Sequence, residues 1–225
     1  ETMQFMAFCV LLIALLLCRR LSLFMPFGFL MGGLALMVSM MGENNPQITT
    51  LMPVLASPLL SFHVAIIMFA YSLLAFLFFN GITALVLWHT DNGVRLADRL
   101  SDLSRLILYP AVFLLALGIF IGAVWANVSW GRYWGWDPKE TWALITLVVY
   151  AMIIHARFVP KLRSDYAFSV MSVYGLLAVL MTYFGVNYYL TGLHAYGSGD
   201  VPPAVDIIGL VYLVITVLAV IAARK

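Results

Sequence analysis

The stretch LLIALLL at residues 11–17 shows what kind of fold this chain adopts. Its apolar side chains follow one another without a break, whereas a membrane-spanning strand would alternate apolar and polar residues over about 10 positions. The stretch lies in the middle of a longer apolar run, residues 3–18, and a run of this kind is typical of a spanning helix of about 20 residues. The pattern predicts an all-α polytopic membrane protein.

The composition of the whole chain agrees with this prediction. Only 12 basic and 10 acidic residues occur among 225, and 64% of the residues are hydrophobic. A soluble domain carries about 25% charged residues, against 10% in this chain. A soluble core of this size could not bury so many apolar side chains, and a disordered chain would be polar. Both classes are therefore excluded.

Apolar runs recur along the sequence, and we expect about seven transmembrane helices. Seven helices of about 20 residues use about 140 positions, so the connections are short and residues 1–225 are expected to form a single transmembrane domain. The sequence contains no zinc spacing, phosphate loop, nucleotide fingerprint or hydrolase triad. Membrane lipid is expected to contact the helices, and no nucleic acid is expected as a partner. The runs are roughly 3–18, 21–41, 60–88, 106–128, 142–158, 166–190 and 205–223.

The positions of the basic residues predict the orientation of these helices. Ten of the 12 fall in alternate connections or at the C-terminus, and an excess of Lys and Arg marks the cytoplasmic side. The N-terminus is therefore predicted outside and the C-terminus in the cytoplasm. Two exceptions, Arg132 and Lys139, lie in an external connection. The ten are Arg19, Arg20, Arg95, Arg99, Arg105, Arg157, Lys161, Arg163, Arg224 and Lys225.

Two connections carry local signals of helix formation. Ser57 and Pro58 suit the N-cap and first position of a helix, which would place His63 in its second turn, near the outer membrane surface. The cytoplasmic segment 91–105 suits either a short amphipathic helix on the membrane surface or a solvated loop.

The external connection with the two exceptional cations is rich in tryptophan, and we call residues 125–142 the tryptophan-rich segment. It holds five of the six tryptophans of the chain. Part of its sequence is explained by a helix start with Asp137 at the N-cap, Pro138 next and Glu140 as capping-box partner. A belt of aromatic residues at the membrane interface is the competing explanation for the rings. Their concentration favours binding of a large, flat, partly anionic ligand. The tryptophans are Trp125, Trp130, Trp134, Trp136 and Trp142.

Histidines near this segment narrow the choice of ligand. His63 and His194 are both expected on the external side, and paired imidazoles can ligate a haem iron axially. His155 is expected about 20 Å deeper in the fifth run, and an ionisable residue inside a span suggests a function. The alternative for His155 is a place near the lipid headgroups beside Arg157. His89 is expected to be interfacial.

The run WGRYWGWDPKETWALIT at residues 130–146, followed by His155, closely resembles the signature of the haem-handling WWD membrane proteins. Within that group it is most similar to the CcsA (ResC) family of System II cytochrome c biogenesis. SFHV at 61–64, GVN at 185–187 and GLHAY at 192–196 agree with the resemblance, which covers residues 58–223.

The resemblance implies a route for haem b from the cytoplasmic side to an external site. His63 and His194 would hold the iron there, while His155 would belong to an inner site completed by a CcsB (ResB) partner. In some proteins of this kind the CcsB and CcsA parts form one fused polypeptide. A chain that begins with Glu1 rather than Met would be consistent with a fragment of such a fusion. The implied location is the bacterial cytoplasmic or the thylakoid membrane.

The implied reaction is that of a holocytochrome c synthase, which attaches haem to an apocytochrome with a Cys-x-x-Cys-His motif. The substrate brings both thiols, so this chain would mainly position the haem. Arg132 and Lys139 would pair with the haem propionates, unless they only neutralise Asp137 and Glu140. Two alternatives stay open: a haem transporter without ligase activity, similar to CcmC, and an electron carrier similar to cytochrome b.

Overall fold

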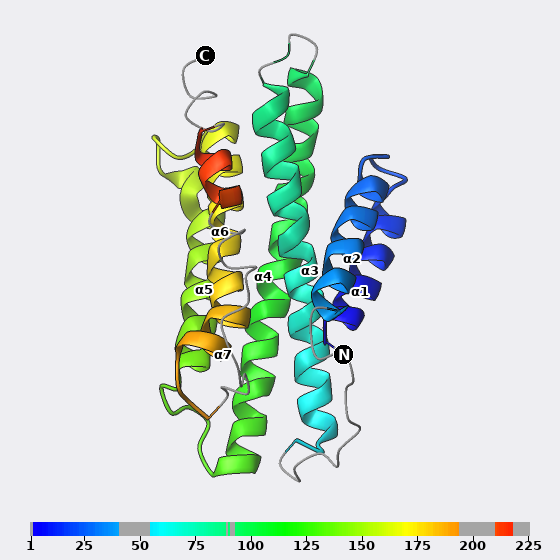
Figure 1. Cartoon of the computed structure of the whole chain (residues 1–225). Helices are drawn as coiled ribbons and strands as arrows, with labels where there is room; N and C mark the ends of the chain where they lie inside the picture. Colours follow the sequence, from blue (N-terminus) through cyan, green and yellow to red (C-terminus); the bar gives the residue numbers. More distant parts are fainter. Residues whose placement is uncertain (1, 41–54, 89, 91–92, 194–209, 218–225) are drawn as a thin grey trace. The chain divides into compact units, whose positions relative to one another are not determined.

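The computed structural model describes residues 2–40, 55–88, 90, 93–193 and 210–217. Every regular element within these ranges is helical, which confirms the all-α prediction for this part of the chain (Figure 1). The chain divides into two compact units. The first unit comprises Glu1–Phe76 and Pro110–Gly135, and the second comprises Leu77–Tyr109 and Trp136–Lys225.

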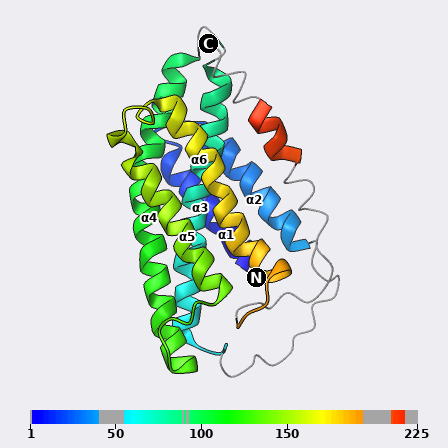
Figure 2. The same cartoon turned by 90° about the vertical axis from the view of Figure 1, so that its left-hand side faces the viewer.

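The first unit begins with a helical hairpin. Helices α1 (Thr2–Leu17) and α2 (Phe24–Met40) lie side by side in both views (Figures 1 and 2). Their backbones approach closely at Gly28, where a Cβ would lie 2.4 Å from the Cβ of Ala14. With 16 and 17 residues, they are about 24–26 Å long, slightly less than the hydrocarbon thickness of about 30 Å.

Helices α3 (Pro58–Leu87) and α4 (Val94–Trp130) each contribute residues to both units. Helix α3 begins at Pro58 as predicted. Helix α4 begins at Val94 rather than near residue 106, so its first turns replace the separate surface helix or loop that the sequence suggested.

Burial explains why α4 starts so early. One face of its first turns is buried, with a spacing of three or four residues that a helix produces: Ala97, Leu100, Ser101 and Ser104. On this face the Asn80 amide donates a hydrogen bond to the Ser104 hydroxyl at 2.9 Å. A loop or a helix lying on the membrane surface would leave this face without the packing that it has here.

The second unit contains the remaining helices. Helix α5 (Pro138–His155) continues into a short 3₁₀ turn, Ala156–Phe158, and α6 (Asp165–Leu180) continues through a π-helix, Met181–Gly185, into α7 (Val186–Tyr189). Helices α5 and α6 lie side by side (Figures 1 and 2). Residues 210–217 are also helical and fall within the predicted run 205–223.

Buried hydroxyl groups connect α5 to the π-helix that follows α6. The hydroxyl oxygens of Thr146 and Thr182 lie 2.8 Å apart, and they lie 2.8 and 3.1 Å from the Trp142 carbonyl oxygen. Each hydroxyl has one proton, so one of them donates to the other and the second donates to a backbone carbonyl. A π-helix leaves backbone groups outside the usual i→i−4 pattern and occurs frequently at functional sites. The contact fixes Trp142 of the tryptophan-rich segment to the π-helix region.

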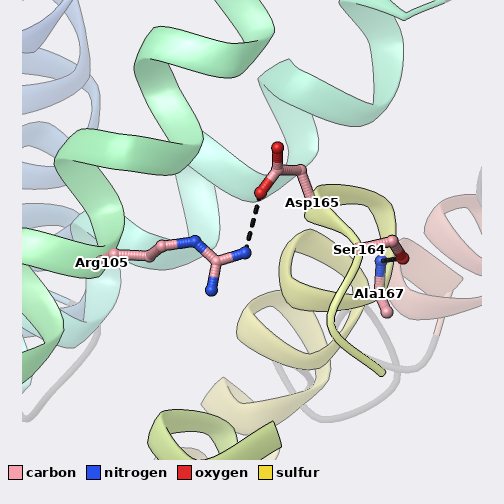
Figure 3. A network of polar contacts seen from close by, with 4 residues as sticks. All are labelled: Arg105, Ser164, Asp165 and Ala167. Carbon is pink, nitrogen blue, oxygen red and sulfur yellow. Dashed lines mark hydrogen bonds and ion pairs between the residues drawn. The ribbon is translucent and has the colours of Figure 1, made fainter. Parts of the chain in front are cut away.

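The start of α6 is fixed by two polar contacts (Figure 3). The Ser164 hydroxyl accepts the Ala167 N–H at 3.1 Å and caps the helix. The Arg105 guanidinium donates to the Asp165 carboxylate at 2.8 Å and lies 4.1 Å above the Phe168 ring. Arg105, predicted between two spans, therefore belongs to α4 and links it to α6 within the second unit.

Among the residues that the structure describes, four helical stretches are long and apolar enough to cross a membrane: α3, α4, Pro138–Phe158 and Asp165–Tyr189. They match the predicted runs 60–88, 106–128, 142–158 and 166–190. The chain is accordingly an α-helical integral membrane protein. Helices α1 and α2 are also apolar but shorter.

Candidate functional site

The tryptophan-rich segment joins the end of α4 to the start of α5. Its backbone enters the left-handed region twice, at Gly131 with φ +72° and at Trp136 with φ +57°. The first is an ordinary place for glycine. The second is unusual, because a bulky side chain in this region clashes with the following carbonyl group and is disfavoured by about 1–2 kcal/mol. Trp136 is nevertheless 70% exposed, so burial of its ring does not offset this strain.

The other rings of the segment differ in exposure. Tyr133 is 60% exposed, and Trp130, Trp134 and Trp142 are half-buried. Trp125 is only 2% exposed and packs edge-on against Trp130, with ring centroids 4.8 Å apart. Trp125 therefore packs against the ring of Trp130 and is too buried to contact a ligand directly.

The start of α5 has the predicted cap. The Asp137 carboxylate accepts the Lys139 N–H at 3.2 Å, and the Glu140 carboxylate accepts the Asp137 N–H at 3.2 Å. Pro138 occupies the first turn, where its missing N–H costs nothing. The sequence-based prediction of a capping box is confirmed.

Asp137 has a second role that the sequence did not reveal. Its other carboxylate oxygen accepts the Leu193 N–H at 2.6 Å, and the carboxylate is buried. Gly192 permits this approach, because a Cβ at that position would lie 2.4 Å from the same oxygen. Leu193 immediately precedes His194 in the sequence. One carboxylate thus fixes both the start of α5 and the chain that leads to the predicted external histidine.

The two exceptional cations have different surroundings. The Lys139 ammonium donates to the Asn187 side-chain oxygen at 3.1 Å, and the Asn187 amide donates in turn to the Tyr183 carbonyl at 2.7 Å. Lys139 therefore joins the first turn of α5 to α7 and the π-helix. Arg132 is exposed, and its guanidinium lies close to the backbone of Gly135.

His63 lies in the second turn of α3, as predicted, and contacts α4 within the first unit. Its Nδ1 is 2.7 Å from the Gly118 carbonyl oxygen. The imidazole covers Gly122, where a Cβ would lie 2.6 Å from the ring Cε1. Because a carbonyl only accepts, Nδ1 carries the proton, and the neutral ring holds its lone pair on Nε2.

His155 is the last residue of α5 and lies at the opposite end of that helix from Asp137. Its Nδ1 is 2.8 Å from the Ala151 carbonyl oxygen, one turn earlier in the same helix, and its side chain is exposed. The Phe158 ring lies 6.2 Å away. Nε2 again holds the lone pair of the neutral ring.

The predicted site residues thus fall into both units. Trp125, Trp130, Arg132, Trp134 and His63 belong to the first unit, and Trp136, Asp137, Lys139, Trp142 and His155 belong to the second. His89 and His194 lie outside the described residues. Within the described ranges, no three His, Cys, Asp or Glu side chains gather to hold a metal ion by themselves.

Sequence reasoning did not single out Gly118 and Gly122, which contact α3 and His63. Asn187 and Gly192 were noted only as part of two segments that support the resemblance, without a role. The spacing of Gly118 and Gly122 is a small-xxx-small pattern, which indicates close helix packing in membranes. The pattern does not indicate that the imidazole of His63 packs against Gly122.

Comparisons with known proteins agree with the resemblance of the sequence. The family described as "Cytochrome C assembly protein" matches residues 1–194. Protein NrfI of Wolinella succinogenes is 39% identical over 208 residues, which cover 90% of this chain and 23% of NrfI. Cytochrome c biogenesis protein CcsA of Chlamydomonas reinhardtii is 33% identical over 211 residues, covering 88% of this chain and 59% of CcsA.

The chain is also similar to Cytochrome c biogenesis protein CcsA of Oryza sativa over a shorter stretch, with 44% identity over 108 residues. This stretch covers 48% of this chain and 33% of that protein. The chain therefore spans less than two thirds of the length of each of these relatives.

Proposed function

The chain belongs to the cytochrome c assembly protein family, and from this premise we propose that it delivers haem b across the membrane for attachment to apocytochrome c. The haem would be held at the external tryptophan-rich segment. The activity is that of a holocytochrome c synthase, in a complex with a CcsB-type (ResB) membrane protein. The substrate is an apocytochrome with a Cys-x-x-Cys-His motif.

The observation that carries the proposal is that Trp136 has a left-handed backbone conformation and an exposed ring. Strained backbone persists only where the surroundings enforce it, and it clusters at functional sites. The capping box follows directly and fixes the backbone on the C-terminal side of Trp136. A large exposed ring held in this way suits contact with a flat aromatic ligand better than general anchoring at the membrane interface.

The histidines fit a haem iron. The porphyrin supplies four nitrogen ligands, so the protein needs to supply only axial ligands, for which imidazole is common. Metal-bound histidines usually donate their other N–H to a carbonyl or carboxylate, and His63 and His155 both have such a partner. In the proposal His63 and His194 hold the iron at the external site. His155 serves the inner site, with its second ligand from the partner protein.

The remaining residues position the ligand. The bound haem supplies two vinyl groups, across which the substrate thiols add without a leaving group. Trp130, Trp134, Trp136 and Trp142 contact the ring in this proposal, and Trp125 supports Trp130. Arg132 is the better candidate for a propionate, because Lys139 already donates to Asn187. Asp137 acts by holding the start of α5 and Leu193.

The proposal includes the topology derived from the basic residues. Seven helices would place the N-terminus and the tryptophan-rich segment outside and the C-terminus in the cytoplasm of a bacterial, or the stroma of a thylakoid, membrane. The test uses single-cysteine variants at Tyr133 and Lys161 in a background with Cys9 and Cys18 replaced by Ala. In intact bacterial cells a membrane-impermeant thiol reagent should label the first, and it should label the second only after lysis. In intact thylakoids, whose exposed face is the stroma, it should label the second, and it should label the first only after lysis. The reverse pattern would invert the topology.

The central test replaces the external ligands one at a time. His63→Ala and His194→Ala, each purified with the partner protein, should lose the absorption bands of histidine-ligated haem from the external site. The yield of cytochrome c with thioether-bound haem should fall with them. Full haem occupancy and full yield in both variants would refute the ligand assignment. Lost yield in a variant that still passes haem to a soluble acceptor would favour a transporter without ligase activity.

A further inference from the structure

The contact between His63 and α4 defines the orientation of the imidazole closely. Two glycines one helical turn apart, Gly118 and Gly122, belong to the face of α4 that meets α3 in the first unit. Gly118 provides the carbonyl oxygen 2.7 Å from Nδ1. At Gly122 a Cβ would lie 2.6 Å from Cε1, 2.8 Å from Nδ1 and 3.3 Å from Nε2, so the ring lies flat against the backbone.

These distances leave no room for a side chain at residue 122. Cβ atoms almost never approach other atoms closer than 3.0 Å, and an imidazole is rigid, so the ring as a whole would have to move. Movement would also lengthen the hydrogen bond to the Gly118 carbonyl. The two glycines therefore act together: one removes the obstacle and the other fixes the tautomer.

We infer that Gly118 and Gly122 form a seat that positions His63 and makes Nε2 the atom that binds the haem iron. This inference rests on the proposed function and adds two positioning residues to it. The hydrogen bond from Nδ1 to the carbonyl also raises the basicity of the ligand, as is usual for metal-bound histidines. All contacts of the seat come from this chain, so we expect the ligand to be oriented before the haem arrives.

The first experiment compares Gly122→Ala with two control variants. Gly81→Ala introduces a similar crowding elsewhere in α3, with its Cβ 2.9 Å from the Ser169 carbonyl oxygen, but it meets no histidine. Gly33→Ala adds a methyl group in open space and reports the general effect of the substitution. All three are purified with the partner protein, and the spin state of the oxidised haem is read by electron paramagnetic resonance.

Gly122→Ala should convert external haem from low to high spin and speed its removal by excess apomyoglobin. Loss of an outer partner of a metal ligand weakens metal binding about 10–100-fold, and the removal rate should change on that scale. Added imidazole should restore the low-spin signal. Gly81→Ala and Gly33→Ala should keep the original signal. A Gly122→Ala protein that behaves like Gly81→Ala would overturn the inference.

A second measurement needs no variant and no haem. Nitrogen-15 NMR of the haem-free complex, labelled at histidine and assigned with His63→Gln, reports which ring nitrogen carries the proton. The seat requires protonated Nδ1 and unprotonated Nε2. The opposite tautomer would refute the seat, even if Gly122→Ala failed to fold. If instead His63→Ala left haem binding intact, the proposed function would fail, whereas the tautomer would still report on the seat.

Discussion

The imidazoles of His63 and His155 are held in two different ways. The Nδ1 of His63 contacts a carbonyl 55 residues away in sequence, on another helix, and its ring lies against that helix. The Nδ1 of His155 contacts a carbonyl only four residues earlier in its own helix, and its side chain is exposed. In the neutral form both rings would hold the lone pair on Nε2, but tertiary structure fixes only the first.

The difference suggests how the two ligands act. A residue fixed by tertiary contacts offers one orientation and suits a site where geometry decides the chemistry. A residue bonded only to its own helix keeps its ring accessible to a second protein. In the proposed function His63 belongs to the attachment site and His155 to a site that the partner completes, and the two kinds of contact match these roles.

The largest expected effect separates the two histidines. His155→Ala should abolish haem at both sites if haem enters from the inside, whereas His63→Ala should leave the inner haem in place. The absorption spectrum and the haem content of each purified complex measure this. His89→Ala serves as the control. Normal external haem in His155→Ala would show that the inner histidine is not on the route.

Trp136→Gly tests whether strain serves ligand binding. Glycine removes the cost of the left-handed conformation, about 1–2 kcal/mol. It also loses more conformational freedom on folding, which destabilises the folded state by up to about 1 kcal/mol. The thermal unfolding temperature in detergent should therefore stay the same or rise slightly, while haem retention falls.

Tyr133→Gly is the matched control for this prediction. It also removes an exposed ring of the tryptophan-rich segment, but its backbone lies outside the left-handed region. It should lower the unfolding temperature slightly, because no strain is relieved. Normal haem retention in Trp136→Gly would contradict a ligand-binding role for this ring.

Asp137→Ala tests the long-range contact in the second unit. The variant loses the helix cap, worth about 0.5–2 kcal/mol, and leaves the Leu193 N–H without its carboxylate, which costs about 1–3 kcal/mol. We expect a clear drop in the free energy of unfolding, measured by thermal unfolding in detergent. Glu140→Gln keeps an oxygen for the Asp137 N–H and should have little effect.

Asp137→Ser separates the two roles of this carboxylate. Serine can cap α5 but cannot also bind the Leu193 N–H with a second oxygen. If the contact with Leu193 matters for the neighbouring His194, this variant should recover only the capping part of the stability, remain about 1–3 kcal/mol less stable than the unsubstituted protein, and lose external haem. Equal haem content in Asp137→Ser and the unsubstituted protein would limit Asp137 to capping.

Local features could be predicted from the sequence and contacts between distant residues could not. The capping box at Asp137 and the helix start at Pro58 depend on residues within one turn, and both were predicted. The early start of α4 was not predicted. The polar and apolar pattern over 94–105 is compatible with a solvated loop, with a separate surface helix and with the first turns of a longer helix. Only burial of the face around Leu100 decides among them.

The same reason explains what was missed at the site. The residue types of His63 and Asp137 drew attention to them, and their positions on helices were right. Which backbone group each one meets depends on the angle and register of helix packing, which a single sequence does not specify. Glycine was the available signal at residues 122 and 192, but glycine also marks turns, flexible points and simple close packing.

The smallest expected effect comes from the ion pair between Arg105 and Asp165. It joins residues 60 positions apart, against 55 for the His63 contact, but its side chains are 29% and 44% exposed. Water and salt screen such pairs, which contribute about 0–1 kcal/mol. Arg105→Lys keeps the charge and loses the planar contact with Phe168, and it should change the unfolding temperature by a degree or two at most and leave haem content unchanged. A loss of haem as large as that in Gly122→Ala would mean that sequence separation, and not burial, marks the contacts that matter for function.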